Sequence, residues 1–384
     1  MLKTIRQKLC FAMILAGLSA GAVAPTWALD AATIKAQQAI VVDYETGNIL
    51  LSKNENDRMP TSSMSKVLTM YVVFKAMKNG QLQMDQTLPV SENAWRMQGS
   101  KMFVTLGSQV PVQDLIRGVI VQSGNDATIV LAEGLAGSEQ AFASLMNDEA
   151  KRLGMQNSHF MNASGWPDEN HYSTAKDLAK LGWGIIHDFP DLYQIYSEKE
   201  YTYNNIKQGN RNPLLYANVG GDGIKTGHTE AAGYGLIGSG KGPDGRRVVF
   251  VVNGYASMND RFEETPRILD WALKNFTNQR VFTAGKPLTD ARVVFGHTEK
   301  VSLSVASDLV MTLPRFQTGK VKMTATYKSP LVAPLKAGQE VGVVTLDAPG
   351  LPSRKVPLIV TQDVDQQNIF SRAIAKVMVR FVGL

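Results

Sequence analysis

The chain has 384 residues, of which 44% are hydrophobic, and it carries a formal net charge of +6. This length and composition allow a large buried core and favour two domains. Half of the net charge lies in the N-terminal leader described next, so the remainder is too small to indicate a nucleic-acid-binding protein.

The N-terminus has the pattern of an export signal. Basic residues at positions 3, 6 and 8 precede an uncharged apolar run over residues 9–24, and small side chains at Thr26 and Ala28 follow. We therefore expect residues 1–28 to be a signal peptide that is cleaved after Ala28. An uncleaved anchor is the alternative, but the run is short for a membrane span and ends at Pro25. Cleavage removes Cys10, the only cysteine, which excludes a disulfide framework, a thiol nucleophile and a zinc–thiolate site.

Residues 29–284 are predicted to form a mixed domain of helices and strands. Residues 39–51 have the pattern of two strands around a Gly47-Asn48 turn. Helical periodicity and capping residues dominate from residue 65 to about residue 187, and strand character returns in segments 222–229, 233–240 and 246–255. A helix over residues 265–276, with Thr265 as its cap, is expected to close this domain.

The remaining residues differ in composition. Residues 285–364 contain short β-branched segments about ten residues apart, such as "VKMTATY" and "EVGVVTL", which predict a small β-sandwich domain. No cluster of His, Asp or Glu in it indicates a site, so we interpret it as a spacer or docking domain. Residues 365–384 follow, and Arg372, Lys376 and Arg380 recur there beside a broad apolar face. This pattern predicts an amphipathic helix that binds an anionic membrane surface through residues 368–384, or alternatively one that docks on the β-domain.

A serine and a lysine with helical spacing form the first candidate site. Ser63 lies three residues before Lys66, so both side chains can share one helix face. A neutral lysine there can accept the serine proton, and a helix N-terminus favours an oxyanion. A second match, Ser173 with Lys176, is interpreted as a helix cap with a solvated lysine. The spacing alone is weak evidence, because both residue types are common.

Two further motifs follow in order. Ser123-Gly124-Asn125 lies at a polar break between two apolar segments, and Lys225-Thr226-Gly227 occurs once. On a strand, the latter would offer a cation and a hydroxyl to a carboxylate, and the glycine would let a substrate backbone approach. The first residues of the three motifs, Ser63, Ser123 and Lys225, are separated by intervals of 60 and 102 residues.

The ordered set resembles the low-molecular-mass penicillin-binding proteins that are serine D-alanyl-D-alanine carboxypeptidases. The likeness covers nearly the whole chain, although Gly124 stands where the general motif has aspartate. It implies an α/β (α+β) catalytic domain of the β-lactamase/transpeptidase type, with an antiparallel sheet flanked by helices and a helical subdomain. A second, small all-β sandwich domain and a C-terminal amphipathic helix complete the expected fold.

The resemblance also implies a role for each motif residue. Ser63 matches the acylated nucleophile and Lys66 its proton acceptor. Ser123 would relay protons, and Asn125 would orient Lys66 and the substrate amide. Lys225 and Thr226 would bind the substrate carboxylate, and Gly227 would let the substrate backbone approach. The backbone N–H groups of Ser63 and His228 would hold the oxyanion.

The implied reaction removes the terminal D-Ala from peptidoglycan stem pentapeptides through a Ser63 acyl-enzyme, with no metal or organic cofactor. β-Lactam antibiotics would act as inhibitors, and the protein would be periplasmic, attached to the outer face of the inner membrane. A serine β-lactamase and a catalytically weak penicillin-binding scaffold are the alternatives. A class A β-lactamase needs a glutamate before the Lys-Thr-Gly strand as its deacylating base. Glu169 precedes that strand here, but the residues around it do not have the usual pattern. Nucleotide binding is not expected, because the glycines of residues 233–238 are followed by a turn and a strand rather than a helix.

Overall fold

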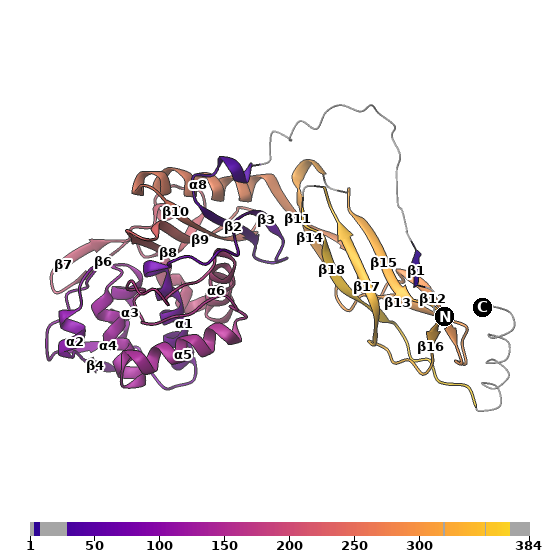
Figure 1. Cartoon of the computed structure of the whole chain (residues 1–384), viewed down its shortest axis with the longest axis horizontal. Helices are drawn as coiled ribbons and strands as arrows, with labels where there is room; N and C mark the ends of the chain where they lie inside the picture. Colours follow the sequence, from indigo (N-terminus) through magenta and orange to yellow (C-terminus); the bar gives the residue numbers. More distant parts are fainter. Residues whose placement is uncertain (1–3, 8–28, 318, 350, 369–384) are drawn as a thin grey trace. The chain divides into compact units, whose positions relative to one another are not determined.

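The computed structural model describes residues 4–7, 29–317, 319–349 and 351–368 (Figure 1). The chain forms two compact units, Pro25–Asn275 and Phe276–Leu384 with Met1–Ala24. Among the described residues, no helix is both long enough and apolar enough to cross a membrane. The expected C-terminal helix over 365–384 falls almost entirely outside the described residues, as does most of the expected signal peptide.

The first unit is built on a five-stranded antiparallel sheet with the order β3-β2-β10-β9-β8. The β2–β3 hairpin turns at Gly47, whose φ of 69° suits glycine. All five strands of this sheet lie in segments where the sequence predicted strands, and the loop 242–246 joins β9 to β10. The strands of this unit are β2 (Gln38–Asp43), β3 (Ile49–Lys53), β4 (Thr87–Pro89), β5 (Gln109–Pro111), β6 (Glu200–Tyr203), β7 (Ile206–Gly209), β8 (Gly221–Thr229), β9 (Gly233–Lys241) and β10 (Arg247–Tyr255).

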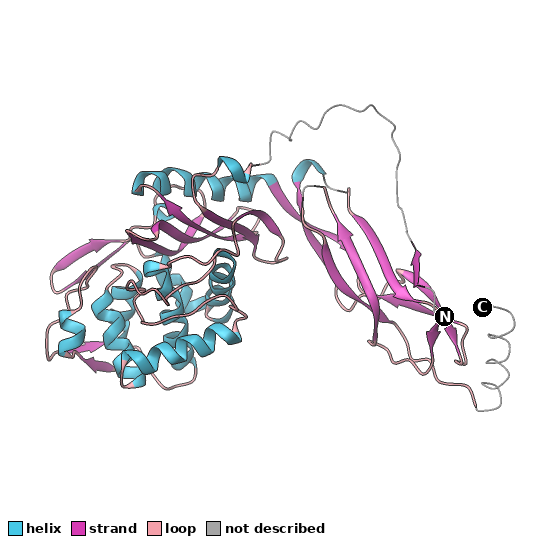
Figure 2. Ribbon diagram, viewed as in Figure 1, coloured by secondary structure: helices cyan, strands magenta, loops and turns pink. Residues whose placement is uncertain are grey.

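Helices lie on both faces of this sheet. Figure 2 shows the C-terminal helix of the unit, α8, on one side and the other helices on the opposite side. Gly182 of α6 lets that helix approach the sheet, since an added Cβ would lie 2.9 Å from Val249 of β10. The helices are α1 (Lys66–Lys78), α2 (Glu92–Arg96), α3 (Val112–Ile120), α4 (Asn125–Ala136), α5 (Glu139–Arg152), α6 (Ala175–Asp188), α7 (Pro190–Tyr193) and α8 (Met258–Asn275).

Helix α1 occupies the interior of the unit. Its residues are buried on nearly every side, from Lys66 through Phe74, and the side chains are apolar apart from Lys66, Thr69 and the hydroxyl of Tyr71. A helix that is apolar all round is stable only inside a protein core. This placement carries the first residue of the helix, Lys66, into the interior as well.

Helix α8 begins earlier than the sequence indicated. The expected start at Thr265 is wrong: the helix begins at Met258, and Pro266 lies inside it. Ser257 provides the cap, since its hydroxyl accepts a hydrogen bond from the Asp260 N–H at 3.0 Å. Thr265 instead donates to the Arg261 carbonyl at 2.8 Å. Proline is common in the first turn of helices, which made residue 266 a misleading start signal.

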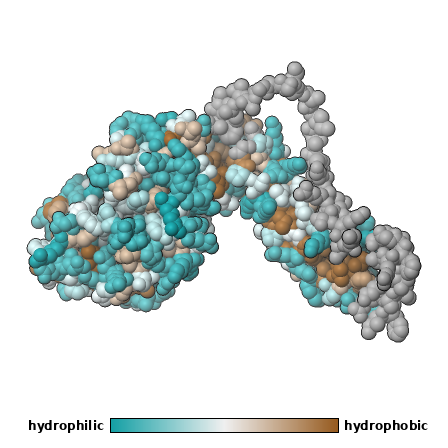
Figure 3. Space-filling model, viewed as in Figure 1, coloured by the Kyte–Doolittle hydropathy of each residue, from teal (hydrophilic) through white to brown (hydrophobic). Residues whose placement is uncertain are grey.

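The second unit is all β. A seven-stranded sheet with the order β1-β15-β17-β18-β13-β12-β16 lies beside a two-stranded sheet, β11-β14, and residues of both enclose one apolar core. Apolar side chains also reach the face of this unit that Figure 3 shows. Its strands are β1 (Thr4–Gln7), β11 (Phe276–Phe282), β12 (Thr289–Val294), β13 (Lys300–Ser304), β14 (Leu309–Pro314), β15 (Lys322–Lys328), β16 (Leu331–Val332), β17 (Glu340–Asp347) and β18 (Arg354–Val360).

Two strands of this unit differ from the sequence-based assignment. Strand β11 pairs with β14, so residues 276–282 lie in the β unit, whereas the sequence placed the domain boundary after residue 284. Strand β1, within the expected signal peptide, pairs with the edge strand β15. Removal of residues 1–28 would leave that edge of β15 without β1.

A buried ion pair joins the sheet of the first unit to α8. Arg246, just before β10, donates to Asp43 Oδ2 of β2 at 2.9 Å, and both side chains are almost fully buried. The same guanidinium donates to the carbonyls of Ala272 and Leu273 in the last turn of α8. The cation therefore also stabilises the negative end of that helix.

Loss of one partner should be costly, because it leaves a buried charge unpaired. We expect Asp43→Ala to lower the free energy of unfolding by ~3–5 kcal/mol. Asp270→Ala, which breaks the exposed Lys274–Asp270 pair, should cost under about 1 kcal/mol. Urea unfolding followed by tryptophan fluorescence measures both in the first unit, because all five tryptophans lie between positions 27 and 271. Equal losses for the two variants would contradict this assignment.

Candidate active site

The nucleophile candidate lies in a short 3₁₀ turn that leads into α1. This turn, η2 (Ser62–Ser65), ends where α1 begins at Lys66. Lys66 Nζ lies 2.8 Å from Ser63 Oγ, so the structure joins the two residues that the sequence paired. Ser65 is instead held by its neighbours, since its hydroxyl bonds to Thr61 at 2.6 Å and to His171 Nε2 at 2.8 Å.

Lys66 contacts oxygens from three separate parts of the chain. Besides Ser63, its Nζ donates to Asn125 Oδ1 and to the Ser164 carbonyl, each at 2.7 Å. Burial, and to a lesser degree the positive charge of Arg211, lower the pKa of Lys66 from 10.5 to about 7. At neutral pH a large fraction of this amine is therefore uncharged and can accept the Ser63 hydroxyl proton.

The middle motif forms the turn into α4. Ser123 has a left-handed backbone with φ of 62° and borders the same small cavity as Ser63. Asn125, the first residue of α4, uses its side-chain carbonyl for Lys66 and its Nδ2 for the Gln98 carbonyl at 2.7 Å. With both ends of the amide bonded, the side chain has one orientation relative to Lys66.

Asp126, next in the chain, holds the loop that borders the site. Its buried carboxylate accepts hydrogen bonds from the backbone N–H groups of Met102, Phe103 and Val104 at 2.9–3.2 Å. A charged acceptor for three backbone donors strongly fixes a loop conformation. Sequence reasoning missed this role, because an Asp in the first turn of a helix is ordinarily explained by the helix dipole.

The third motif lies on the edge strand β8. Lys225 is buried and donates to the Thr226 carbonyl at 3.2 Å. Burial first, and then the charge of Lys66, hold the pKa of Lys225 well below its ordinary value. Gly227 lies against the nucleophile turn, and an added Cβ would lie 2.6 Å from Ser62 Oγ. The motif therefore needs glycine for contact between β8 and η2.

A cavity of about 300 Å³ connects the motifs. Its lining combines the candidate nucleophile, the middle serine and two residues of the third motif with two arginines. The described lining residues are Ser63, Ser100, Ser123, Arg211, Thr226, Gly227, His228, Tyr234, Met258 and Arg261.

The two arginines were not identified from the sequence. Arg211 donates to Ser100 Oγ at 3.0 Å, and burial lowers its pKa. Arg261, on α8, donates to the Gly227 carbonyl at 3.1 Å and lies over the Tyr234 ring. Neither residue belongs to a local motif: one lies in a polar loop and the other on a helix whose start was placed too late.

The carbonyl of Ser164 was missed for a similar reason. A side chain two residues earlier, Asn162, accepts hydrogen bonds from the N–H groups of Ser164, Gly165 and Trp166. This Asx-type turn fixes the loop that directs the Ser164 carbonyl to Lys66. Asn three residues before Gly165 is a recognisable turn signal, but it does not indicate which distant side chain the loop contacts.

The other sequence candidates have structural explanations. Thr174 caps α6 by accepting from the Asp177 N–H at 3.1 Å, and Lys176 is exposed, so the second serine–lysine match lies at a helix cap. The glycines at 233–238 lie on β9 within the sheet. A phosphate-binding loop would instead lie between a strand and a helix. Among the described residues, no group of three or more His, Cys, Asp or Glu is placed to hold a metal ion.

A buried lysine bonded to a serine hydroxyl, beside a cation-lined cavity, defines a serine acyl-transfer enzyme. Residues 25–257 match the family model described as D-alanyl-D-alanine carboxypeptidase, and residues 276–366 match the penicillin-binding protein 5 C-terminal domain. The chain belongs to the D-alanyl-D-alanine carboxypeptidase family. The expected family, its serine hydrolase activity on D-alanyl-D-alanine peptides and the two-domain fold class are thereby confirmed.

Individual relatives agree with this family. The chain is 37% identical to the D-alanyl-D-alanine carboxypeptidase DacC of Escherichia coli, over 97% of each chain. The structure of penicillin-binding protein 5 from Haemophilus influenzae superposes with a TM-score of 0.78 at 38% identity, covering 87% of this chain and 98% of that one. The cefotaxime-bound penicillin-binding protein D2 of Listeria monocytogenes superposes with a TM-score of 0.57 at 31% identity, covering 62% and 97%.

The pKa of Lys66 predicts the pH dependence of the reaction. Because the uncharged Lys66 amine can accept the Ser63 proton and the ammonium cannot, kcat/KM for D-Ala release should fall about tenfold per pH unit below pH 7 and level off above it. Arg211→Gln removes a positive charge that lowers this pKa, so the midpoint should move to higher pH. Arg96→Gln, at an exposed position on α2, should leave the midpoint in place. A rate independent of pH between 5 and 8 would rule out this role for Lys66.

Proposed function

We propose that Ser63 is the nucleophile of this carboxypeptidase and that Lys66 is its proton acceptor. The 2.8 Å contact between Lys66 Nζ and Ser63 Oγ, at a lysine whose pKa is about 7, is the observation that carries the proposal. Ser63 Oγ attacks the carbonyl of the penultimate D-Ala as its proton passes to Lys66. The C–N bond then breaks, and D-Ala leaves with a proton supplied from the Lys66–Ser123 side of the site.

The substrate carboxylate is proposed to bind at Lys225 and Thr226. Lys225 is buried with a lowered pKa, and an incoming carboxylate would raise that pKa and favour the ammonium form. Arg211 and Arg261 line the cavity that Thr226 borders and add positive charge there. These groups explain a preference for a free terminal carboxylate, the feature that distinguishes a carboxypeptidase substrate from an internal peptide bond.

The oxyanion of each tetrahedral intermediate is proposed to lie between the backbone N–H groups of Ser63 and His228. Such donors stabilise charge that develops only in the transition state. Water then attacks the acyl-enzyme carbonyl, its proton is taken up at Lys66, and Ser63 is released with its own proton restored. Asn125, bonded at both ends of its amide, keeps Lys66 positioned through both steps.

β-Lactams are proposed to acylate the same serine. The Listeria relative is described in cefotaxime-bound and ampicillin-bound forms, and a β-lactam presents an acyl carbonyl and a carboxylate comparable to those of the dipeptide. When the β-lactam ring opens, the cleaved amine stays attached to the acyl group instead of leaving as D-Ala does. Deacylation should therefore be slow.

The site assignment can be tested with one variant. Ser63→Ala should abolish D-Ala release from a pentapeptide ending in D-Ala-D-Ala, a loss of at least about 10³-fold in kcat. Mass spectrometry of the unaltered protein after incubation with penicillin should place the adduct on Ser63. Ser65→Ala is the matched control, because it removes a hydroxyl from the same turn, and the adduct should still form.

Other outcomes would decide against the proposal. An adduct on Ser62 or Ser65 would overturn the residue assignment. Rapid hydrolysis of penicillin would favour a β-lactamase, and an adduct without D-Ala release would favour a catalytically weak scaffold.

The chain is further proposed to be exported and to attach to the outer face of the inner membrane. The N-terminal charge and apolar pattern supports cleavage after Ala28, and the basic amphipathic pattern of residues 368–384 supports surface attachment. Each lies mainly outside the described residues, so sequence is the basis of both proposals.

Deletion of residues 367–384 should release the mature protein from vesicles that contain anionic lipid, because it removes the apolar face and three basic residues. Vesicle flotation measures the bound fraction. Substituting Arg372, Lys376 and Arg380 with Gln should weaken binding and reduce its salt dependence. Unchanged flotation after the deletion would contradict membrane attachment through this segment.

A further inference from the structure

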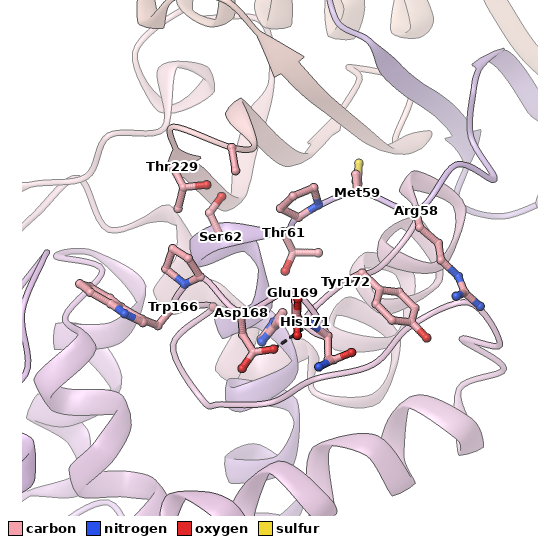
Figure 4. Close-up of a pocket in the computed structure, with 15 residues that line it drawn as sticks. Arg58, Met59, Thr61, Ser62, Trp166, Asp168, Glu169, His171, Tyr172 and Thr229 are labelled. Atoms are coloured by element: carbon pink, nitrogen blue, oxygen red, sulfur yellow. Dashed lines mark hydrogen bonds between the residues drawn. The ribbon is translucent and has the colours of Figure 1, made fainter.

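A buried histidine joins the loop that contains the Ser164 carbonyl to the nucleophile turn. Residues 153–174 connect α5 to α6, and this loop has Ser164 near its middle and His171 near its end. The His171 side chain is buried, and its Nε2 lies 2.8 Å from Ser65 Oγ in η2. Figure 4 shows His171 beneath Thr61, the residue that leads into η2. One imidazole therefore links the two segments whose relative position determines how the catalytic amine is held.

The partners of the imidazole ring determine which of its nitrogens carries the proton. The Met161 backbone N–H donates to His171 Nδ1 at 3.2 Å, so this nitrogen has no proton of its own. Burial lowers the pKa of His171 from 6.5 to about 4, against an opposing effect of the Asp168 carboxylate. The ring is therefore neutral at pH 7, with its proton on Nε2. It donates this proton to Ser65 Oγ, which leaves the Ser65 hydroxyl to donate to Thr61 at 2.6 Å.

The position of the Ser164 carbonyl determines where the lone pair of Lys66 points. An uncharged amine has two N–H donors and one lone pair. Two acceptors face this amine, Asn125 Oδ1 and the Ser164 carbonyl, and each lies 2.7 Å from Nζ. When both N–H groups are bonded in this way, the lone pair is left for the hydroxyl of Ser63, 2.8 Å away. A displaced carbonyl would free one N–H group and let the amine rotate away from the serine.

Contacts between uncharged groups hold the loop on both sides of Lys66. The lysine cannot do this alone, because its amine gains and loses a proton during the reaction and the strength of its own hydrogen bonds changes with it. One turn further along α1, Thr69 donates to the carbonyl of Ala163 at 2.6 Å. Directly before the lysine, Ser65 accepts from His171. The loop is thereby fixed relative to the start of α1 whatever the charge of the amine.

We propose that His171 is a positioning residue for the acylation of Ser63. Its neutral ring, protonated on Nε2, joins the loop to Ser65 and so fixes the Ser164 carbonyl that orients the Lys66 amine. The ring does not touch the reacting atoms. Loss of this link should slow acylation and leave substrate binding nearly unchanged, because the substrate carboxylate is assigned to β8. The role rests on the proposed function, since His171 acts through Ser63 and Lys66.

Two amide substitutions separate the link to η2 from the contacts within the loop. Gln can donate to Ser65 from the place of Nε2, whereas Asn is one carbon shorter and reaches only the place of Nδ1, where it can accept from the Met161 N–H. Acylation by penicillin should stay within about threefold for His171→Gln but slow by about 10- to 100-fold for His171→Asn and His171→Leu, as expected for a displaced catalytic group. KM for the pentapeptide should change by less than about threefold in all of them. Equal acylation rates for the Gln and Asn variants would overturn the proposal.

His159 offers a matched control on the same loop. Its side chain is exposed, and its Nδ1 donates to the Asn170 carbonyl at 2.9 Å rather than to η2. His159→Asn and His159→Leu should therefore keep the unaltered acylation rate and KM. All rates are measured well below the Tm of each variant, so that folded proteins are compared. An unaltered acylation rate in His171→Leu would refute the positioning role.

A double-mutant cycle shows whether the effect passes through Ser65. Ser65→Ala removes the acceptor of the His171 bond but keeps the nucleophile, so the penicillin adduct should still form, more slowly. Because both changes break the same bond, the double variant His171→Asn/Ser65→Ala should acylate within about threefold of the slower single variant. Two effects that multiply would show independent roles and would contradict the link.

Failure of the proposed function gives a different result. If the penicillin adduct does not form on Ser63, the nucleophile assignment is wrong, and the link is then judged by NMR alone. In isotope-labelled protein at pH 7, the His171 ring should have the spectrum of the neutral Nε2–H tautomer, identified by its absence from His171→Gln. Its N–H signal should shift in Ser65→Ala and stay in place in His159→Leu. A cationic ring or an Nδ1–H tautomer would overturn the proposal whether or not the enzyme turns over.

Discussion

The contact between the Lys66 amine and three oxygens is the interaction on which the site depends. These oxygens belong to Ser63, Asn125 and the Ser164 carbonyl, and each comes from a different element. A buried ammonium is unstable without such partners, and an uncharged amine is free to accept a proton. The fold therefore has to bring η2, the start of α4 and the loop after residue 160 to one point.

Burial of Lys66 also affects the stability of the fold. In the unfolded chain this lysine binds a proton up to about pH 10.5, whereas in the folded chain its pKa is about 7. Between these values the unfolded state holds the additional proton, so the stability of the fold rises with pH across this window. Lys225 has a lowered pKa of the same origin. A site with two buried lysines is thus destabilising for the fold, and the apolar surroundings of α1 help to offset that cost.

The loops around the site show how that arrangement is held in place. Asp126 fixes the segment 102–104 through three backbone N–H groups, and Asn162 fixes the turn that contains the Ser164 carbonyl. Both are short polar side chains that bond to backbone rather than to substrate. Gly165 also lies directly against the turn η2, because a Cβ added there would be 1.8 Å from the Ser62 carbonyl oxygen. Loop position, rather than residue identity alone, determines what Ser63 and Lys66 can do.

The sequence by itself determined the family, the main strands and helices, and the motif residues, because these depend on local periodicity and on fixed spacing within one element. Ser63 and Lys66 are three residues apart on one helical segment, so their contact could be predicted. Arg211, Arg261 and the Ser164 carbonyl could not be, because each reaches the site from a distant segment with no local pattern. The start of α8 and the pairing of β11 with β14 were likewise decided by tertiary packing. Only the folded chain fixes which polar groups share a low-dielectric interior, and that shared burial is what lowers the pKa of Lys66.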